Sequence, residues 1–167
     1  MMFERNPRVD ATTLRLIEEA QAMATPTPRL SFSLTAQGFH FTLTTRLSPH
    51  APAPADNCTL HILLVLPPDV YADRYELAQR PGLPTKSLTG ESDLELPVGA
   101  VDEGGSVLLL EAREGTREGG ELVVDVPLHA RYGRPSVGGG YRTIQLERPM
   151  GFWACPSSNS SNSSECV

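Results

Sequence analysis

The stretch VPLHARYGRP, at residues 126–135, carries the densest group of side chains in the chain that could take part in chemistry. It places His129, Arg131 and Tyr132 between two prolines. A histidine can take up or release a proton near neutral pH, and an arginine can hold a carboxylate or a phosphate. The stretch could therefore belong to an active site, a ligand-binding surface or an ordinary strand.

Alternation of apolar and polar residues indicates that this stretch ends a β-strand. His129 and Arg131 then point the same way and could jointly hold an anion, whereas Tyr132 is expected to pack on the apolar face. Pro127 cannot donate to a ladder, which predicts a sheet edge or a bulge. Two interpretations stay open for the polar face, the exposed face of an edge strand and a binding surface. The apolar face is expected to carry Leu122, Val124, Val126, Leu128, Ala130 and Tyr132.

No other part of the sequence completes a catalytic set around these residues. A nucleophilic triad needs a serine or cysteine beside a histidine and a carboxylate, and the chain has no G-x-S-x-G elbow. The three cysteines and four histidines show no zinc spacing, so neither a metal ion nor a cofactor is expected. Paired carboxylates could serve a glycosidase, but the acidic candidates lie in loop-like segments without a signature: Asp69, Asp73, Glu76, Asp93 and Glu95.

The elements that must position the stretch are mostly strands. Residues 30–35 and 39–47 alternate on either side of Gln37-Gly38, which predicts a hairpin with one wet face that includes His40. Residues 70–80 could form a short helical turn or an irregular crossover, and residues 79–93 are expected to be a long loop. Further strands are expected at residues 58–66, 106–113, 122–132 and 141–147, the last with Ile144 and Leu146 inward.

The order of these elements predicts an all-β fold, an antiparallel β-sandwich with one short N-terminal helix. The helix is expected at residues 10–24, with Asp10 or Thr12 as its cap, and TPTP at 25–28 should end it. The predicted parts are an N-terminal helix and Pro-rich linker at 1–28, a sandwich domain at 29–155, and a disordered Ser/Asn-rich tail at 156–167.

Charge and targeting signals constrain the setting of the protein. A net charge of −6 argues against a nucleic-acid partner, because such binders usually have a basic surface. The sequence has no run of 18 apolar residues and no secretory signal at its start. Three N-x-S/T acceptors nevertheless fit a secretory lumen, at Asn57, Asn159 and Asn162.

The cysteines leave the redox state open. Their number is odd, so at most one bridge within the chain leaves one thiol over. Cys58 could pair with Cys155, because both flank apolar strand-like segments. Buried or unpaired thiols are the alternative.

The order of four segments resembles the PIG-X family over roughly residues 30–155. The residues His129, Arg131 and Tyr132 match its H-x-R-Y motif. A second match is a Y-x-D-x-Y-like run at Tyr71, Asp73 and Tyr75. The four segments are LPPDVYADRYEL (66–77), DLELPV (93–98), VPLHARYGRPS (126–136) and YRTIQLERPMGFWAC (141–155).

This resemblance implies a non-catalytic accessory subunit of glycosylphosphatidylinositol (GPI) mannosyltransferase I on the luminal side of the endoplasmic reticulum membrane. The implied partner is a multi-spanning catalytic subunit similar to PIG-M, which adds the first mannose to the GPI precursor. Membrane association is expected through that partner or through a C-terminal helix that this sequence does not show, as in a truncated chain. Expected partner contacts are His129, Arg131, Tyr132 and Asp73.

Two other classes of function remain open on the sequence. One is a free β-sandwich that binds a carbohydrate or a protein without a membrane partner. The other is a small β-rich hydrolase.

Overall fold

The computed structural model of the chain describes residues 29–47, 53, 55, 57–83, 85–112, 116–118, 121–135, 137–139 and 142–156. Three predictions fall outside these residues. They are the helix at residues 10–24, the glycosylation acceptors at Asn159 and Asn162, and the tail after its first residue. The structure therefore speaks to the predicted sandwich domain.

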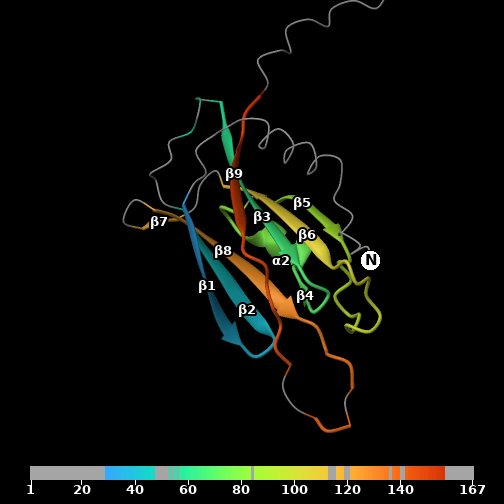
Figure 1. Ribbon diagram of the computed structural model, residues 1–167. Coiled ribbons are helices and arrows are strands. Elements are labelled where there is room, and N and C mark those ends of the chain that lie inside the picture. The colour runs from blue at the N-terminus through green and yellow to red at the C-terminus, as the bar shows by residue number, and fades with distance from the viewer. Residues whose placement is uncertain are drawn as a thin grey trace, which may run out of the picture.

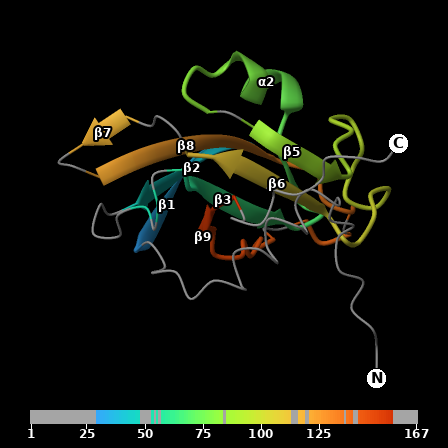
Figure 2. The same cartoon turned by 90° about the horizontal axis from the view of Figure 1, so that it is seen from above.

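The described chain folds as two antiparallel sheets that pack face to face, with one short helix (Figures 1 and 2). Sheet A has the order β1-β2-β8-β4, with β7 also paired to β8, and sheet B has the order β5-β6-β3-β9. This confirms the predicted all-β class. Sheet A contains β1 (Leu30–Gln37), β2 (His40–Leu47), β8 (Glu121–Ala130), β4 (Val70–Tyr71) and β7 (Thr116–Glu118). Sheet B contains β5 (Thr85–Gly90), β6 (Ser106–Glu111), β3 (Thr59–Leu66) and β9 (Met150–Ala154).

The helix α2 (Arg74–Gln79) lies at the border of the two sheets and contacts both β5 and β8 (Figure 2). Residues 70–80, for which a helical turn and an irregular crossover were the alternatives, contain both the short strand β4 and this helix. No helix in the described ranges is long and apolar enough to cross a membrane.

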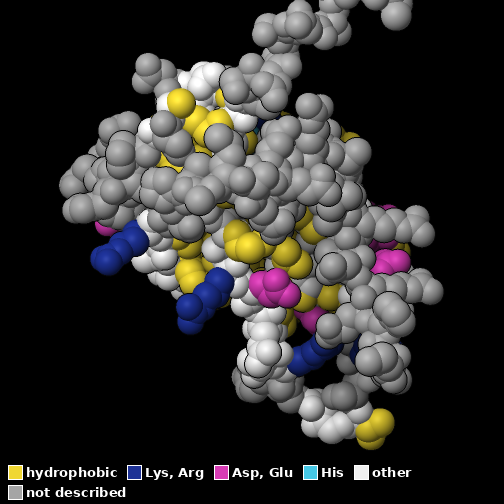
Figure 3. Space-filling model, turned by 45° about the horizontal axis from the view of Figure 1, so that its top comes forward, with side chains coloured by type: hydrophobic (Ala, Val, Ile, Leu, Met, Phe, Trp, Pro, Cys, Tyr) yellow, Lys and Arg dark blue, Asp and Glu magenta, His cyan; other side chains and the backbone are white. Residues whose placement is uncertain are grey.

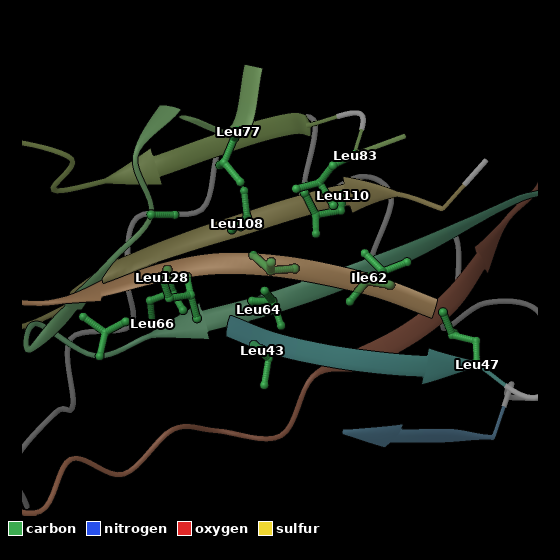
Figure 4. Close-up of a cluster of buried hydrophobic side chains, with 14 of the residues drawn as sticks. Leu43, Leu47, Ile62, Leu64, Leu66, Leu77, Leu83, Leu108, Leu110 and Leu128 are labelled. Atoms are coloured by element: carbon green, nitrogen blue, oxygen red, sulfur yellow. The ribbon is translucent and has the colours of Figure 1, made fainter. Parts of the chain in front are cut away.

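The core lies between the sheets and consists mainly of leucine side chains from both (Figure 4). β3 and β6 are apolar in consecutive positions because each is buried on both faces, as a central strand should be. A second, smaller cluster of Leu63, Val107 and Leu109 occupies the opposite face of sheet B, with Phe152 packed against it. The labelled core residues are Leu43, Leu47, Ile62, Leu64, Leu66, Leu77, Leu83, Leu108, Leu110 and Leu128.

The predicted hairpin at the start of the domain is confirmed. Gln37 pairs with His40 across a two-residue loop, and all eight positions of β1 pair with β2 in one unbroken register. Gly38 has φ 65°, the left-handed conformation that a tight hairpin turn needs at its first central position. His40 is exposed, as its place on the wet face predicted.

Two sequence predictions were wrong about strands in sheet B. Residues 79–93 were expected to be a loop, but they contain β5, whose polar sequence TKSLTG hid its pairing with β6. The last strand was expected at 141–147, but the sheet begins to pair only at Met150. Ile144 and Leu146 do point inward and pack, partly buried, against the core. Their alternation therefore reflects side-chain packing, since no strand pairing is described at these residues.

Pro127 lies in β8, which pairs with other strands on both sides. Its nitrogen, which has no hydrogen to donate, points to the side of β8 that has no described partner strand at this position. The Ala130 N–H donates to the Phe39 carbonyl at 2.8 Å, so even-numbered residues of β8 direct their backbone groups toward β2. Pro127 therefore directs its nitrogen the other way. On that side β7 pairs with residues 121–123 and β4 with residues 129–130, and no described strand pairs with residues 124–128.

A disulfide between Cys58 and Cys155 joins the start of β3 to the end of β9. These two strands are neighbours in sheet B, and Thr59 pairs with Ala154 beside the bridge. The bridge spans a sequence separation of 97 residues. A cross-link over so long a loop strongly restricts the unfolded chain.

Replacing both Cys58 and Cys155 with serine should lower the free energy of unfolding by about 3–5 kcal/mol, because the unfolded chain regains its loop entropy. Urea unfolding followed by circular dichroism measures the change. Wild-type protein in a strong reductant is the matched control and should unfold like the double variant. Equal midpoints for the oxidised wild type and the double variant would contradict the stabilising role of the bridge.

Candidate functional site

The three segments that carry the most specific residues of the chain meet at one end of the sandwich. β8 carries His129, and Arg131 directly follows that strand. β4 and α2 carry Tyr71 and Glu76, and the loop after β5 contributes the backbone of Asp93. We call these five residues the motif cluster. They come from positions up to 60 residues apart, and antiparallel pairing of β4 with β8 is what brings them together.

Arg131 lies at the centre of the motif cluster and is only 5% exposed. Its Nη1 atom donates to the Leu96 carbonyl at 2.9 Å and also to the Asp93 carbonyl. Its guanidinium carbon lies 4.6 Å from the centroid of the Tyr71 ring, a favourable cation–π position. Its backbone N–H donates to the Asp69 carbonyl at 2.8 Å. One side chain thus joins the end of β8 to β4 and to the loop at 91–98.

His129 is half-buried between three other side chains. Its Nε2 atom lies 2.8 Å from Glu76 Oε2, an interaction that ties β8 to α2. Its ring stacks on Tyr71 with centroids 5.1 Å apart and meets the edge of His40 at 4.7 Å. The contacts of His129 are therefore with side chains of β2, β4 and α2.

The helix α2 is held in place by its own cap and by ion pairs. Asp73 is the N-cap residue, and its Oδ1 atom accepts from the Tyr75 N–H at 2.8 Å. Glu76 pairs with Arg80 one turn later at 3.1 Å. Arg74 donates from Nη2 to the Ser92 hydroxyl at 2.6 Å, which links α2 to the loop at 91–98.

The loop at 91–98 is shaped by its own acidic side chains and by glycine at its base. The Glu91 carboxylate accepts from the Asp93 N–H, and the Asp93 carboxylate accepts from the Glu95 N–H, each at 2.9 Å. Gly105 has φ 64°, and a Cβ there would lie 2.1 Å from the Leu66 carbonyl oxygen. These turns present the carbonyls of the loop to Arg131. Sequence reasoning missed this role, because an acceptor carbonyl leaves no signature in residue type.

Tyr132 and Tyr75 are the exposed members of the family motifs. Tyr132 is 71% exposed and its ring packs against Phe39 with centroids 5.0 Å apart. The expectation that Tyr132 packs on the apolar face was wrong, because β8 ends at Ala130 and the alternation of faces ends with it. Tyr75 is 68% exposed, so the run at residues 71–75 has one half-buried ring, Tyr71, and one exposed ring, Tyr75.

The exposed-face interpretation of the polar residues was also wrong for Arg131. Arg131 directly follows β8 and is only 5% exposed, and the loop at 91–98 covers its guanidinium. The prediction that His129, Arg131, Tyr132 and Asp73 contact a partner is not tested by this geometry.

The electrostatics of the motif cluster are those of paired, partly buried charges. Burial lowers the pKa of Arg131 from its usual value, and the nearby Glu91, Tyr71 and Asp93 oppose that change. Burial raises the pKa of Tyr71, against the effect of the Arg131 charge. Burial alone would raise the pKa of Glu76, but hydrogen bonds from His129 and Arg80 outweigh it and lower the pKa from 4.5.

The contacts of the motif cluster are suited to holding chain segments together. Arg131 donates to backbone carbonyls, His129 pairs with Glu76, and Asp73 caps α2. Among the described residues, no group of three or more histidine, cysteine or acidic side chains could hold a metal ion. Fold and cluster together define a β-sandwich domain whose most distinctive residues fix its own loops.

Comparison with known proteins gives the family. The sequence model described as PIG-X / PBN1 matches residues 36–166. The chain is 38% identical over 134 residues to Protein pbn1 of Aspergillus oryzae and 40% identical over 126 residues to Protein pbn1 of Neurospora crassa. It is also 30% identical over 117 residues to Protein pbn1 of Schizosaccharomyces pombe. The chain belongs to the PIG-X/PBN1 family.

The matches cover most of this chain but a small part of the relatives. Each of the Aspergillus and Neurospora alignments covers 71% of the chain, and 24% and 25% of the relative. The Schizosaccharomyces alignment covers 65% of the chain and 35% of the relative. The chain thus spans about a quarter of the length of the first two relatives. No solved structure matches it.

Arg131→Ala should lower the free energy of unfolding by about 2–4 kcal/mol, because the carbonyls of Asp93 and Leu96 lose a charged donor and Tyr71 loses its cation. Urea unfolding measures the loss. Tyr132→Ala, one residue away and exposed, is the matched control and should cost about 1 kcal/mol or less. Equal losses for the two variants would contradict the assignment of Arg131 as the anchor.

Glu76→Gln should destabilise the domain at neutral pH and progressively less in acid. The pKa of Glu76 is lowered in the folded state, so its stabilising effect is present above pH 4.5 and is lost as the pH falls through the lowered pKa. Urea midpoints between pH 7 and pH 3 measure the difference from wild type. In a His129→Ala background the same exchange should have a smaller effect. A difference that stays constant down to pH 3 would contradict this account.

Proposed function

We propose that this chain is the luminal domain of a non-catalytic PIG-X-like subunit of GPI mannosyltransferase I. In this role it stabilises a multi-spanning, PIG-M-like catalytic subunit that adds the first mannose to the GPI precursor. Membership of the PIG-X/PBN1 family carries the proposal. The catalytic chemistry then belongs to the partner chain.

The structure supports a luminal setting in two ways. Disulfides persist in oxidising compartments such as the lumen of the endoplasmic reticulum, and the Cys58–Cys155 bridge joins the start of β3 to the end of β9. Asn57 begins an N-x-S/T acceptor and is exposed in the turn just before β3, where a glycan would project into solvent. Both features fit a chain that folds after translocation.

The motif cluster supports a non-catalytic role, in which the domain binds a partner protein. Arg131 and His129 fix the geometry of α2 and of the loop at 91–98. Tyr75 and Tyr132 project from these fixed segments, and exposed tyrosines are common in protein interfaces. The buried members of the family motifs would then hold a surface in shape, and the exposed members would meet the partner.

Deleting the whole gene should lower the abundance of the catalytic partner and block addition of the first mannose. Immunoblots of the tagged partner and radiolabelled mannose incorporation into GPI precursors measure these two effects. Deletion of the partner itself is the control and should cause the same loss of mannosylated precursor. Unchanged partner abundance together with unchanged mannosylation would contradict the proposed function.

A further inference from the structure

The outer edge of β1 differs from every other described sheet edge in having no protection against pairing. Natural edge strands are usually short, bulged or charged, which prevents unwanted pairing with other chains. On sheet A, the other border is formed by β4 and β7, of two and three residues. On sheet B, β5 has a register shift and carries Lys86, and β9 has five residues. β1 has eight residues, LSFSLTAQ, with no charge, proline or bulge.

The backbone groups on this edge can be assigned to particular residues. A two-residue hairpin loop places Gln37 and His40 in a hydrogen-bonded pair, so the odd-numbered residues of β1 bond to β2. The backbone N–H and C=O groups of Phe32 and Leu34 therefore point to the outer edge. In the described part of the chain, β1 pairs only with β2.

The side chains beside this edge form an apolar row on the inward face of sheet A. Phe32 and Leu34 are opposite the buried residues Thr45 and Leu43 in β2, so all four point toward the same face. Because β1 is the border strand, Phe32 remains 43% and Leu34 51% exposed. Apolar side chains also reach the surface among separate charged ones in the space-filling view (Figure 3).

The charge pattern limits what can cover the row. Residues 30–45 contain no Asp, Glu, Lys or Arg, although 20% of the chain is charged. A charged segment would lose its hydration here without gaining a counter-charge, so the row suits an uncharged occupant. Lipid tails suit the side chains but cannot satisfy the free N–H and C=O groups. An extended polypeptide satisfies both requirements.

We propose that β1 is a strand-addition site for an extended, uncharged segment of the membrane-bound partner. That segment pairs with the outer backbone groups of Phe32 and Leu34 and lays alternate apolar side chains beside theirs. The inference rests on the proposed function for the identity of the partner. The site itself is argued from the structure, because most of β1 precedes the matched residues 36–166.

Leu34→Pro tests the ladder directly, because proline removes the outer N–H of Leu34 and leaves the bonds to β2 in place. Leu34→Thr is the matched control, since it also loses the leucine side chain but keeps the N–H. Both changes are made in the tagged full-length protein that contains this domain. Co-purification of the catalytic partner from detergent extracts is the readout. Leu34→Pro should reduce partner recovery about tenfold, and Leu34→Thr less than about threefold.

Folding is checked separately in the purified proteins. Leu34→Pro and Leu34→Thr should have similar urea midpoints, whereas Thr35→Pro should be clearly less stable because Thr35 bonds to β2. A midpoint for Leu34→Pro as low as that of Thr35→Pro would overturn the assignment of the outer edge.

Other outcomes separate the alternatives. Full recovery of the partner with Leu34→Pro would overturn the site, and equal losses for both exchanges would overturn pairing through the backbone. Sedimentation of the purified protein tests a second copy as the occupant. A wild-type dimer that Leu34→Pro dissociates, with partner recovery unchanged, would overturn the partner assignment. The proposed function fails separately, when deletion of the whole gene leaves partner abundance and mannosylation unchanged.

Discussion

The domain depends on the buried guanidinium of Arg131, which makes hydrogen bonds where β4 is too short to provide backbone pairing. β4 has only two residues, too few to fix α2 and the loop at 91–98 by backbone pairing alone. Arg131 extends that connection, because its backbone bonds to Asp69 and its side chain bonds to the carbonyls of Asp93 and Leu96. An arginine suits this position because its charge persists on burial and its rigid fork can donate to several carbonyls at once.

The same constraint explains why the most recognisable motif of the chain is mostly buried. His129 lies in β8 and meets β4 and α2, and Arg131 directly follows the strand and meets β4 and the loop at 91–98. Exchanging either residue removes a partly buried hydrogen bond between these segments. Motif residues that identify a family can thus report on the architecture of a domain, and the exposed residues of these motifs are Tyr132 and Tyr75.

The fold was largely predictable because period-two alternation is a local signal. It predicted the hairpin of β1 and β2 and most of β8, while consecutive apolar residues predicted the doubly buried β3 and β6. It failed at β5, where TKSLTG is too polar to show a buried face, and at residues 141–147, where alternation reflects packing of Ile144 and Leu146. The site was less predictable. Its acceptors are the carbonyls of Asp93 and Leu96, and their position depends on loop turns that residue types do not encode.

The position of Pro127 and the unpaired edge of β1 follow from a single rule, the alternation of backbone direction along a strand. Pro127 is tolerated because its nitrogen faces the gap between β7 and β4. The outer backbone groups of Phe32 and Leu34 point away from β2 because the hairpin uses the odd positions, and no described strand pairs with them. At Pro127 the backbone lacks an N–H donor, and no described strand would accept from it there. At β1 it has kept every donor, beside exposed apolar side chains and without a charge. Among the described residues, β1 therefore lacks the features by which edge strands usually avoid pairing, and this is the basis of the proposed strand addition.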